Sequence, residues 1–482
     1  MFKKKKIVRK LIKVIFRPSQ RDRLFLVLFL QFFFIVTRFL GYRNPVATSD
    51  YGNHLLISKY MVEGKVPYRE FSLTHMPGLY WLLRLGFLVS DSVFWPFLFY
   101  VLVVSLVVPG LYFFTKTFFK EDFIVLLAVI LFLGDPLLTL YAKVVTFDCL
   151  ALVFIVFILL VLGKKTLLRR DYLLLALLFS VNFLIKITAA YYWAFFLFSF
   201  FVVYYQNRVE VIKVIKIGLT FFFSTSITLL ALKVSMPELL PDILSSHLLR
   251  PAMSLKERLF FLFHTLSLSP VLLLLAFLVA WPMLFLVRDK KVKHRALFFL
   301  VFFIFSVFIP RHFYQHHLIT VLPIGLSLVA SAAKAFLAFF NKQRMPNKNF
   351  VFSLASLTLA IFLTKHTFYS LVLLAYNNLK TGEIYERASK LEGKMFANNN
   401  FFYMITGKEP HFWYFVTIPD GPCRWGNSCY MHQKILASSD YALLDSAAKI
   451  HILDPGFYQY LYSNFYLDSY EQFGELSLYL RR

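Results

Sequence analysis

The chain has 482 residues, of which 59% are hydrophobic and 16% are charged, and it carries a formal net charge of +26. Soluble globular proteins have about 45–50% apolar and about 25% charged residues. This composition excludes a disordered protein and argues against a soluble enzyme. In a polar chain, a basic excess of this size would suggest nucleic-acid binding. Its meaning here depends on where the basic residues lie relative to the apolar segments.

Eleven apolar segments are predicted to cross a membrane, since a spanning helix needs about 20 mostly apolar residues. The stretch 172–206 is too long for one crossing and contains Lys186, so it holds two helices or one helix and a re-entrant segment. The chain is therefore predicted to be a polytopic α-helical membrane protein. The predicted spans are 24–41, 94–114, 123–139, 149–163, 172–188, 189–206, 216–233, 269–287, 296–310, 318–340 and 350–370.

Basic residues mark alternate loops between these segments, starting with the arm 1–23. Lys and Arg gather in cytoplasmic loops, so the N-terminus is predicted to be cytoplasmic and, with an odd number of spans, 371–482 to be extracytoplasmic. The arm is expected to meet anionic membrane lipids, and nucleic acid is a poor fit because no folded recognition module is present. No cleavage site follows the first apolar segment, which predicts a retained span.

Three regions follow from this pattern. They are a basic cytoplasmic arm at 1–23, a transmembrane domain at 24–370 with its first extracytoplasmic loop at 42–93, and an extracytoplasmic C-terminal domain at 371–482. The last region lacks any apolar run of twenty residues and is long enough for a small domain. The chain is thus predicted to be a membrane protein of the cell membrane with one soluble domain outside.

Short periodic runs suggest that the C-terminal domain is mixed α/β. Phe412–Thr417 is β-like, and helix-like runs lie at 433–440 and near 442–449. Cys423 and Cys429 would face an oxidising compartment, where a disulfide or two free thiols are both open.

Ionisable residues near a membrane are functional candidates, because burying a charge there is costly. Asp50 follows the first span and precedes an amphipathic run at helical spacing, so it could also cap that helix. Asp148 lies at the mouth of the fourth span, five residues after Lys143. A helix cap or an interfacial ion pair with Lys143 would explain Asp148 equally well.

These two loops resemble the GT-C superfamily of polyprenyl-phosphate-sugar glycosyltransferases, especially the branch of protein O-mannosyltransferases and lipid A aminoarabinose transferases. In that branch an Asp follows the first span and a stretch of the form G..pY.df...hpPl comes next. Here Asp50 is followed by Gly64, Pro67, Tyr68, Arg69, Glu70, Phe71, His75, Met76, Pro77 and Gly78. The family's Pro, second acidic residue and later Lys correspond to Pro136, Asp148 and Lys186 of this chain. The sequence HFYQHHLITVLP at 312–323 resembles a later aromatic element of the family. Some relatives have Glu-Lys-Pro-Pro where this chain has Thr74, His75, Met76 and Pro77. The role of a catalytic Glu is therefore not transferred to this stretch.

The resemblance implies an inverting transfer of a sugar from a polyprenyl-phosphate donor to a hydroxyl acceptor of unknown type on the extracytoplasmic side. Asp50 would be the general base, and Asp148 would orient the acceptor or share the electrostatic work. Cations would stabilise the leaving phosphate, although Lys186 could instead snorkel to headgroups. Candidates for substrate or donor-phosphate binding are Lys143, Lys186, Arg250, Arg311, His317, Tyr68 and His75.

No metal ligand is predicted. His312 and His316 have the i, i+4 spacing of helical metal ligands, but no acidic residue accompanies them, and placement at the membrane interface is simpler. No cofactor is expected otherwise, although a divalent cation between Asp50 and Asp148, as in oligosaccharyl-transferring relatives, stays open.

Two other classes compete with the transferase. A transporter or flippase typically shows inverted repeats and broken helices at the midplane, whereas the chain has no half-to-half correspondence. An O-antigen-type ligase would concentrate Arg and His in a late outside loop, but the long loop here is the first one.

Overall fold

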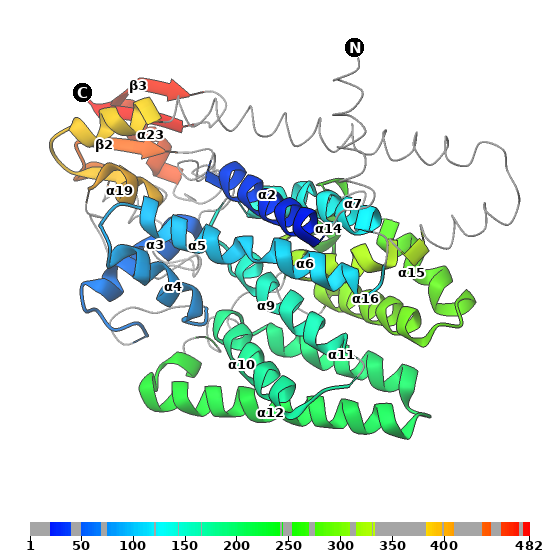
Figure 1. Ribbon diagram of the computed structural model, residues 1–482. Coiled ribbons are helices and arrows are strands. Elements are labelled where there is room, and N and C mark those ends of the chain that lie inside the picture. The colour runs from blue at the N-terminus through cyan, green and yellow to red at the C-terminus, as the bar shows by residue number, and fades with distance from the viewer. Residues whose placement is uncertain are drawn as a thin grey trace, which may run out of the picture.

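Most of the helical region and part of the C-terminal region are described by the computed structural model (Figure 1). Up to residue 332 the described chain is almost entirely helical, whereas from 382 onwards it contains both helices and strands. The described residues are 20–39, 50–68, 75–119, 122–142, 144–164, 166–241, 243, 253–268, 275–308, 315–329, 331–332, 382–397, 400–408, 436–444, 455–471 and 476–482.

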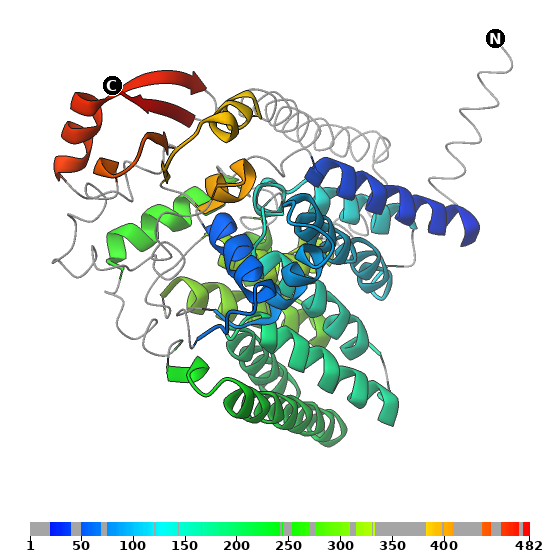
Figure 2. The ribbon, with the colours of Figure 1, turned by 90° about the vertical axis from the view of Figure 1, so that its left-hand side faces the viewer.

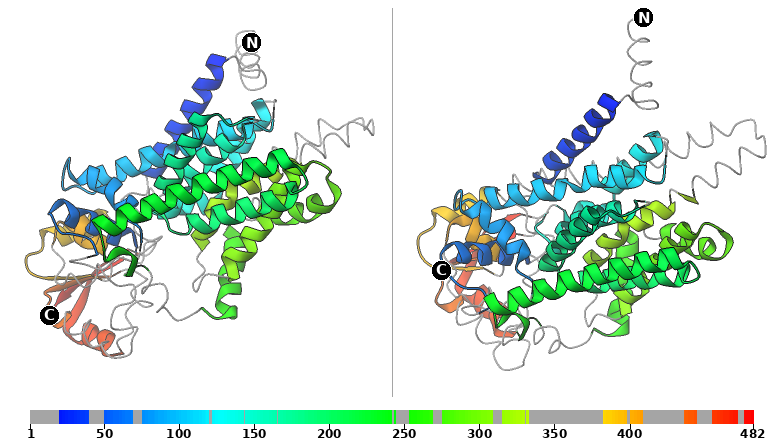
Figure 3. Two further views of the ribbon diagram at one scale, coloured as in Figure 1. Left: turned by 90° about the horizontal axis from the view of Figure 1, so that it is seen from below. Right: turned by 60° about the horizontal axis from the view of Figure 1, so that its bottom comes forward.

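The helices follow the predicted apolar segments and form a bundle, with α12 lying along α10 and α11 (Figure 3). Large apolar side chains such as Phe222 and Ile227 on α12 point outward, as expected for a surface that meets lipid. In chain order the helices are α2 (Gln20–Phe39), α3 (Asp50–Val62), α4 (Gly78–Phe87), α5 (Phe94–Ser105), α6 (Val107–Lys116), α7 (Asp122–Leu133), α8 (Pro136–Tyr141), α9 (Phe147–Leu162), α10 (Arg169–Ile185), α11 (Ala189–Tyr204), α12 (Arg208–Ser235), α14 (Leu255–Leu268), α15 (Leu275–Leu286), α16 (Lys290–Phe308) and the 3-10 helix η2 (Gln315–Val321).

Two described helices are long and apolar enough to cross a bilayer: Phe94–Lys116, which joins α5 and α6, and α12. Shorter apolar helices include α9, α11 and 317–329. Described helices thus occupy ten of the eleven predicted segments in whole or in part, but most are shorter than a full crossing. The segment 350–370 lies outside the described residues, so the number eleven stays a prediction.

The predicted span 123–139 is divided into α7 and α8. Asp135 begins α8, because its carboxylate accepts hydrogen bonds from the N–H groups of Leu137 (3.0 Å) and Leu138 (3.3 Å). Pro136 at the first helical position suits this start, since its missing N–H is not needed there. The short α8 then leads the chain to the loop before Asp148.

The stretch 172–206 forms two helices, α10 and α11, and not one helix with a re-entrant piece. Lys186 interrupts them: it follows the last residue of α10 in an extended conformation, with φ −147° and ψ 120°. The turn between α10 and α11 therefore places Lys186 at one end of the helical bundle.

The basic loops meet at one end of the bundle, called here the basic end. Lys213 at the start of α12 donates to the carbonyl oxygen of Lys164 between α9 and α10 (3.4 Å). Arg295 on α16 lies 4.2 Å from the ring centroid of Phe118, just after α6. The opposite end, called here the α3 end, carries α3 and α4 (Figure 1). The start of α9, with Asp148, and the end of α10, with Lys186, pack against these two helices.

Close backbone contacts hold α4 at the α3 end. A Cβ on Gly86 would lie 2.2 Å from the backbone of Pro96, so α4 and α5 approach as closely as only glycine permits. A Cβ on Gly78 would lie 2.7 Å from the carbonyl oxygen of Leu184 near the end of α10. These contacts place the loop before α4 beside Lys186.

The C-terminal region forms a four-stranded sheet of order β1-β2-β4-β3, with β1 and β2 parallel and the other pairs antiparallel. Its strands are β1 (Met395–Ala397), β2 (Tyr441–Leu444), β3 (Phe465–Glu471) and β4 (Leu476–Arg481). Helix α23 (Pro455–Asn464) packs on one face through Phe457 and Leu461. Helix α19 (Asn400–Thr406) packs against α3, so the sheet sits at the α3 end (Figure 2).

The helix predicted near 442–449 is wrong, because Tyr441–Leu444 is β2. All four residues are buried, since β2 lies between β1 and β4 and is covered on both faces. A strand covered in this way shows a continuous apolar run and not an alternating one. The predicted strand Phe412–Thr417 and the pair Cys423 and Cys429 lie outside the described residues.

Candidate active site

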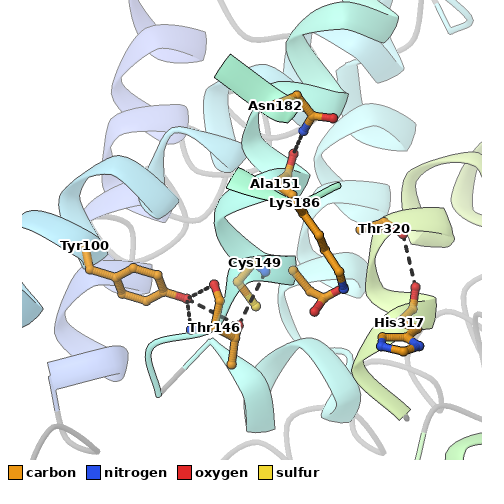
Figure 4. Close-up of polar contacts among 9 residues, drawn as sticks. Tyr100, Thr146, Cys149, Ala151, Asn182, Lys186, His317 and Thr320 are labelled. Atoms are coloured by element: carbon orange, nitrogen blue, oxygen red, sulfur yellow. Dashed lines mark hydrogen bonds and ion pairs between the residues drawn. The ribbon is translucent and has the colours of Figure 1, made fainter. Parts of the chain in front are cut away.

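A buried ion pair joins α9 and α10 at the α3 end. The carboxylate of Asp148, in the first turn of α9, lies 2.5 Å from the ammonium group of Lys186 (Figure 4). Their side chains are 4% and 13% exposed. Removing two charges from water costs free energy that their attraction does not always repay. A pair of this kind in a membrane protein is therefore a candidate for function.

Hydrogen bonds between neighbouring helices set the position of Lys186. The amide of Asn182, one turn earlier on α10, donates to the carbonyl oxygen of Ala151 on α9 at 3.0 Å and accepts from the indole N–H of Trp193 at 3.2 Å (Figure 4 shows the first). The N–H of Lys186 donates to the carbonyl oxygen of Asn182 at 3.0 Å. Asn182 is fully buried. The end of α10 is thus fixed to α9 one turn from Asp148.

Aromatic rings surround Phe147, the residue before Asp148. The ring of His75 stacks on it at 4.6 Å between centroids, and the ring of His54 on α3 meets it edge-on at 4.8 Å. Tyr80 on α4 completes the cluster at 5.6 Å. Side chains from α3 and from the region at the start of α4 therefore converge on the first turn of α9.

The side chain of Tyr68 lies against the backbone of His75. Its hydroxyl donates to the carbonyl oxygen of His75 at 2.6 Å, and its own backbone has a φ of 67°. A bulky residue rarely adopts this left-handed conformation, and such strain gathers at functional sites. The predicted binding residues Tyr68 and His75 thus lie together, with His75 against Phe147, the residue before Asp148, and their contact with substrate stays a prediction.

Asp50 is the first residue of α3. His54 follows it by one helical turn and is buried against Phe147. Since one turn spans about 5.4 Å, the start of α3 lies close to the first turn of α9. Sequence reasoning did not select His54, although its i, i+4 spacing from Asp50 puts both residues on one face of α3.

The other predicted binding residues have different outcomes. His317 lies on η2, which packs against α9, and its carbonyl oxygen accepts a hydrogen bond from the hydroxyl of Thr320 at 3.1 Å (Figure 4). Lys143, Arg250 and Arg311 lie outside the described residues. The ammonium partner of Asp148 is therefore Lys186, and an additional role of Lys143 stays a prediction.

A divalent cation between Asp50 and Asp148 stays a prediction, because the side chain of Asp50 lies outside the described part of the structure. The ammonium group of Lys186 contacts the carboxylate of Asp148. Among the described residues no three His, Cys, Asp or Glu side chains gather as a metal site.

No protein-family model matches the chain, and a comparison with curated proteins finds no match in sequence. Solved structures are similar in fold. One is ArnT from Cupriavidus metallidurans bound to undecaprenyl phosphate, with a TM-score of 0.62 at 13% identity over 96% of this chain and 98% of that one. The same protein in the apo state gives the same TM-score over 94% and 97%.

A second similar structure is the archaeal oligosaccharyltransferase AglB from Archaeoglobus fulgidus, in complex with an inhibitory peptide and a dolichol-phosphate. Its TM-score is 0.55 at 12% identity, over 95% of this chain and 74% of that one. Identities this low carry information about fold and not about activity. The chain therefore shares the fold of ArnT and AglB, which agrees with the resemblance carried by the motifs around Asp50 and Asp148.

Proposed function

We propose that the protein is an integral-membrane glycosyltransferase that moves a sugar from a polyprenyl-phosphate donor to a hydroxyl acceptor, with inversion, on the extracytoplasmic side. The observation that carries the proposal is the buried pair of Asp148 and Lys186 beside the start of α3. The pair lies at the α3 end of the helical bundle. Two proteins with a similar fold were solved with undecaprenyl phosphate or a dolichol-phosphate bound.

In the proposed reaction Asp50 is the general base. It accepts the proton of the acceptor hydroxyl while that oxygen attacks the anomeric carbon of the sugar. The bond between this carbon and the phosphate oxygen breaks, and polyprenyl phosphate leaves with the electron pair. A single displacement of this kind inverts the anomeric configuration, as in other inverting glycosyl transfers.

The leaving phosphate needs positive charge close to the breaking bond. Lys186 supplies an ammonium group at the α3 end, and Asp148 fixes its position through the ion pair. Arg250, Arg311, His317 and Lys143 are the further cations that the family resemblance suggests, with Tyr68 and His75 beside the acceptor or sugar.

Sugar transfer in proteoliposomes tests the proposal. We expect purified protein to convert radiolabelled polyprenyl-phosphate sugars into a product with a new glycosidic bond when supplied with an extract of envelope glycans and lipids as acceptors. Absence of any new bond across a panel of hexose and pentose donors would contradict the proposed activity. Passage of intact donor across the vesicle membrane without bond formation would favour the transporter alternative.

The orientation of the chain can be tested by cysteine labelling of intact cells. The positive-inside rule puts the basic end in the cytoplasm, so Gln206→Cys between α11 and α12 is expected to react with an impermeant maleimide only after permeabilisation. Glu392→Cys in the C-terminal domain is expected to react at once. Both positions are exposed. The variants carry Cys423→Ser and Cys429→Ser, and the reverse labelling pattern would overturn the proposed orientation.

A further inference from the structure

A buried tyrosine holds the backbone just before Asp148. Tyr100 lies on α5 and is fully buried. Its hydroxyl accepts a hydrogen bond from the N–H of Thr146 at 3.1 Å and lies 3.3 Å from the carbonyl oxygen of the same residue, to which it donates (Figure 4). The two residues are 46 positions apart, so these bonds tie α5 to the start of α9.

Thr146 is the N-cap of α9, and Asp148 is the second residue of that helix. The side-chain oxygen of Thr146 accepts from the N–H of Cys149 at 3.4 Å, which fixes the first turn. Tyr100 thus holds the backbone of Thr146, and the side chain of Thr146 holds the first turn of α9. The direction in which Asp148 leaves the helix is therefore set through Thr146.

The same helix α5 also reaches the start of α3. The ring centroid of Phe97, one turn before Tyr100, lies 6.0 Å from that of Tyr51 and 6.4 Å from that of Tyr100. Tyr51 follows Asp50 directly. One stripe of α5 thus contacts both the residue after Asp50 and the cap that precedes Asp148.

We infer that Tyr100 is a positioning residue whose hydroxyl sets the carboxylate of Asp148 relative to Lys186 and to the start of α3. The inference rests on the proposed function and adds to it a residue that touches no substrate. Phenylalanine would fill nearly the same volume but leave the N–H of Thr146 without this acceptor. A buried N–H inside a membrane protein needs a partner, so the segment before α9 would shift to find one.

This shift should lower kcat more than it weakens donor binding. A displacement of about 1 Å at reacting groups can cost about 10²-fold in rate. We therefore expect Tyr100→Phe to lower kcat by about 10- to 100-fold and to leave KM for the donor near the wild-type value. The matched control is Tyr192→Phe, because the buried hydroxyl of Tyr192 makes no hydrogen bond within the described part of the chain. That variant is expected to keep the wild-type kcat.

A double-mutant cycle distinguishes positioning from general damage to the fold. If Tyr100 acts through Asp148, Tyr100→Phe should have no further effect on kcat in the Asp148→Asn background, because contacting residues that act together are not additive. Multiplicative losses would overturn the inference. A Tyr100→Phe variant that is recovered unfolded would also overturn it, since the bonds would then serve folding and not the position of Asp148.

Labelling of Lys186 provides a readout that does not need enzyme activity. A mostly buried ammonium group held by a carboxylate is acylated slowly, because the reagent reaches its nitrogen only when the ion pair opens. We expect the acylation rate of Lys186, followed by mass spectrometry, to rise in Tyr100→Phe towards its value in Asp148→Asn. An unchanged rate would overturn the inference. If wild-type protein transfers no sugar, the proposed function fails while this measurement still decides the role of Tyr100.

Discussion

Replacing Asp50 by asparagine is expected to lower kcat for sugar transfer by about 10²–10⁴-fold, the usual contribution of a positioned general base. An amide has nearly the shape of a carboxylate but cannot accept the proton of the acceptor hydroxyl. Donor binding and the melting temperature should stay near the wild-type values, because Asp50 is the first residue of α3 and not part of its interior. Transfer is measured with radiolabelled donor in proteoliposomes.

The control for Asp50→Asn is Glu63→Gln. Glu63 follows α3, and its carboxylate is 41% exposed next to Lys65, so the same chemical change there removes no group of the proposed site. We expect Glu63→Gln to transfer sugar at the wild-type rate. Full transfer by Asp50→Asn would remove the base from the proposed mechanism, and equal losses in both variants would point to a general effect of charge.

The second large effect concerns the pair of Asp148 and Lys186. Asp148→Asn leaves the mostly buried ammonium group of Lys186 without its carboxylate. Breaking a buried pair in this way costs about 3–5 kcal/mol, so both transfer and the melting temperature should fall. The double variant Asp148→Leu with Lys186→Met replaces the pair by apolar side chains, which is often neutral or stabilising.

The double variant separates stability from function. We expect it to recover the melting temperature of the wild type while sugar transfer stays lost, because the ammonium group of Lys186 no longer stabilises the leaving phosphate. Recovery of transfer together with stability would mean that the pair only supports folding. The control is Asp171→Asn, which weakens the pair of Lys164 and Asp171 (2.6 Å) at the basic end and should leave transfer unchanged.

Much of the helical part could be predicted from the sequence, because the length of an apolar run limits where a helix can begin and end. The division at Lys186 was predictable for the same reason. The break at Asp135 and Pro136 was not predicted, although Asp followed by Pro is a typical helix start. The apolar residues on both sides of this start hid it within one predicted span.

The candidate site was predictable as a set of residue types but not as contacts. Lys143 is the basic residue nearest to Asp148 in the sequence, whereas the described partner is Lys186, which is 38 positions away. The pair forms because the end of α10 returns to the start of α9. Contacts such as those of Tyr100 with Thr146 carry no signal in a single sequence, since a buried Tyr in an apolar helix looks like any other core residue.

The contact of α19 with α3 has a consequence for the order in which the protein is assembled. Helix α3 leaves the ribosome early, whereas α19 and the strands behind it come from the last part of the chain. Fully buried side chains of α19, such as Phe402 and Tyr403, belong to the same core as Leu55 of α3. The helix that begins with Asp50 therefore completes its packing only after residues beyond 400 have been synthesised. We therefore expect nascent chains, and variants truncated before α19, to lack the proposed transfer activity until this contact has formed.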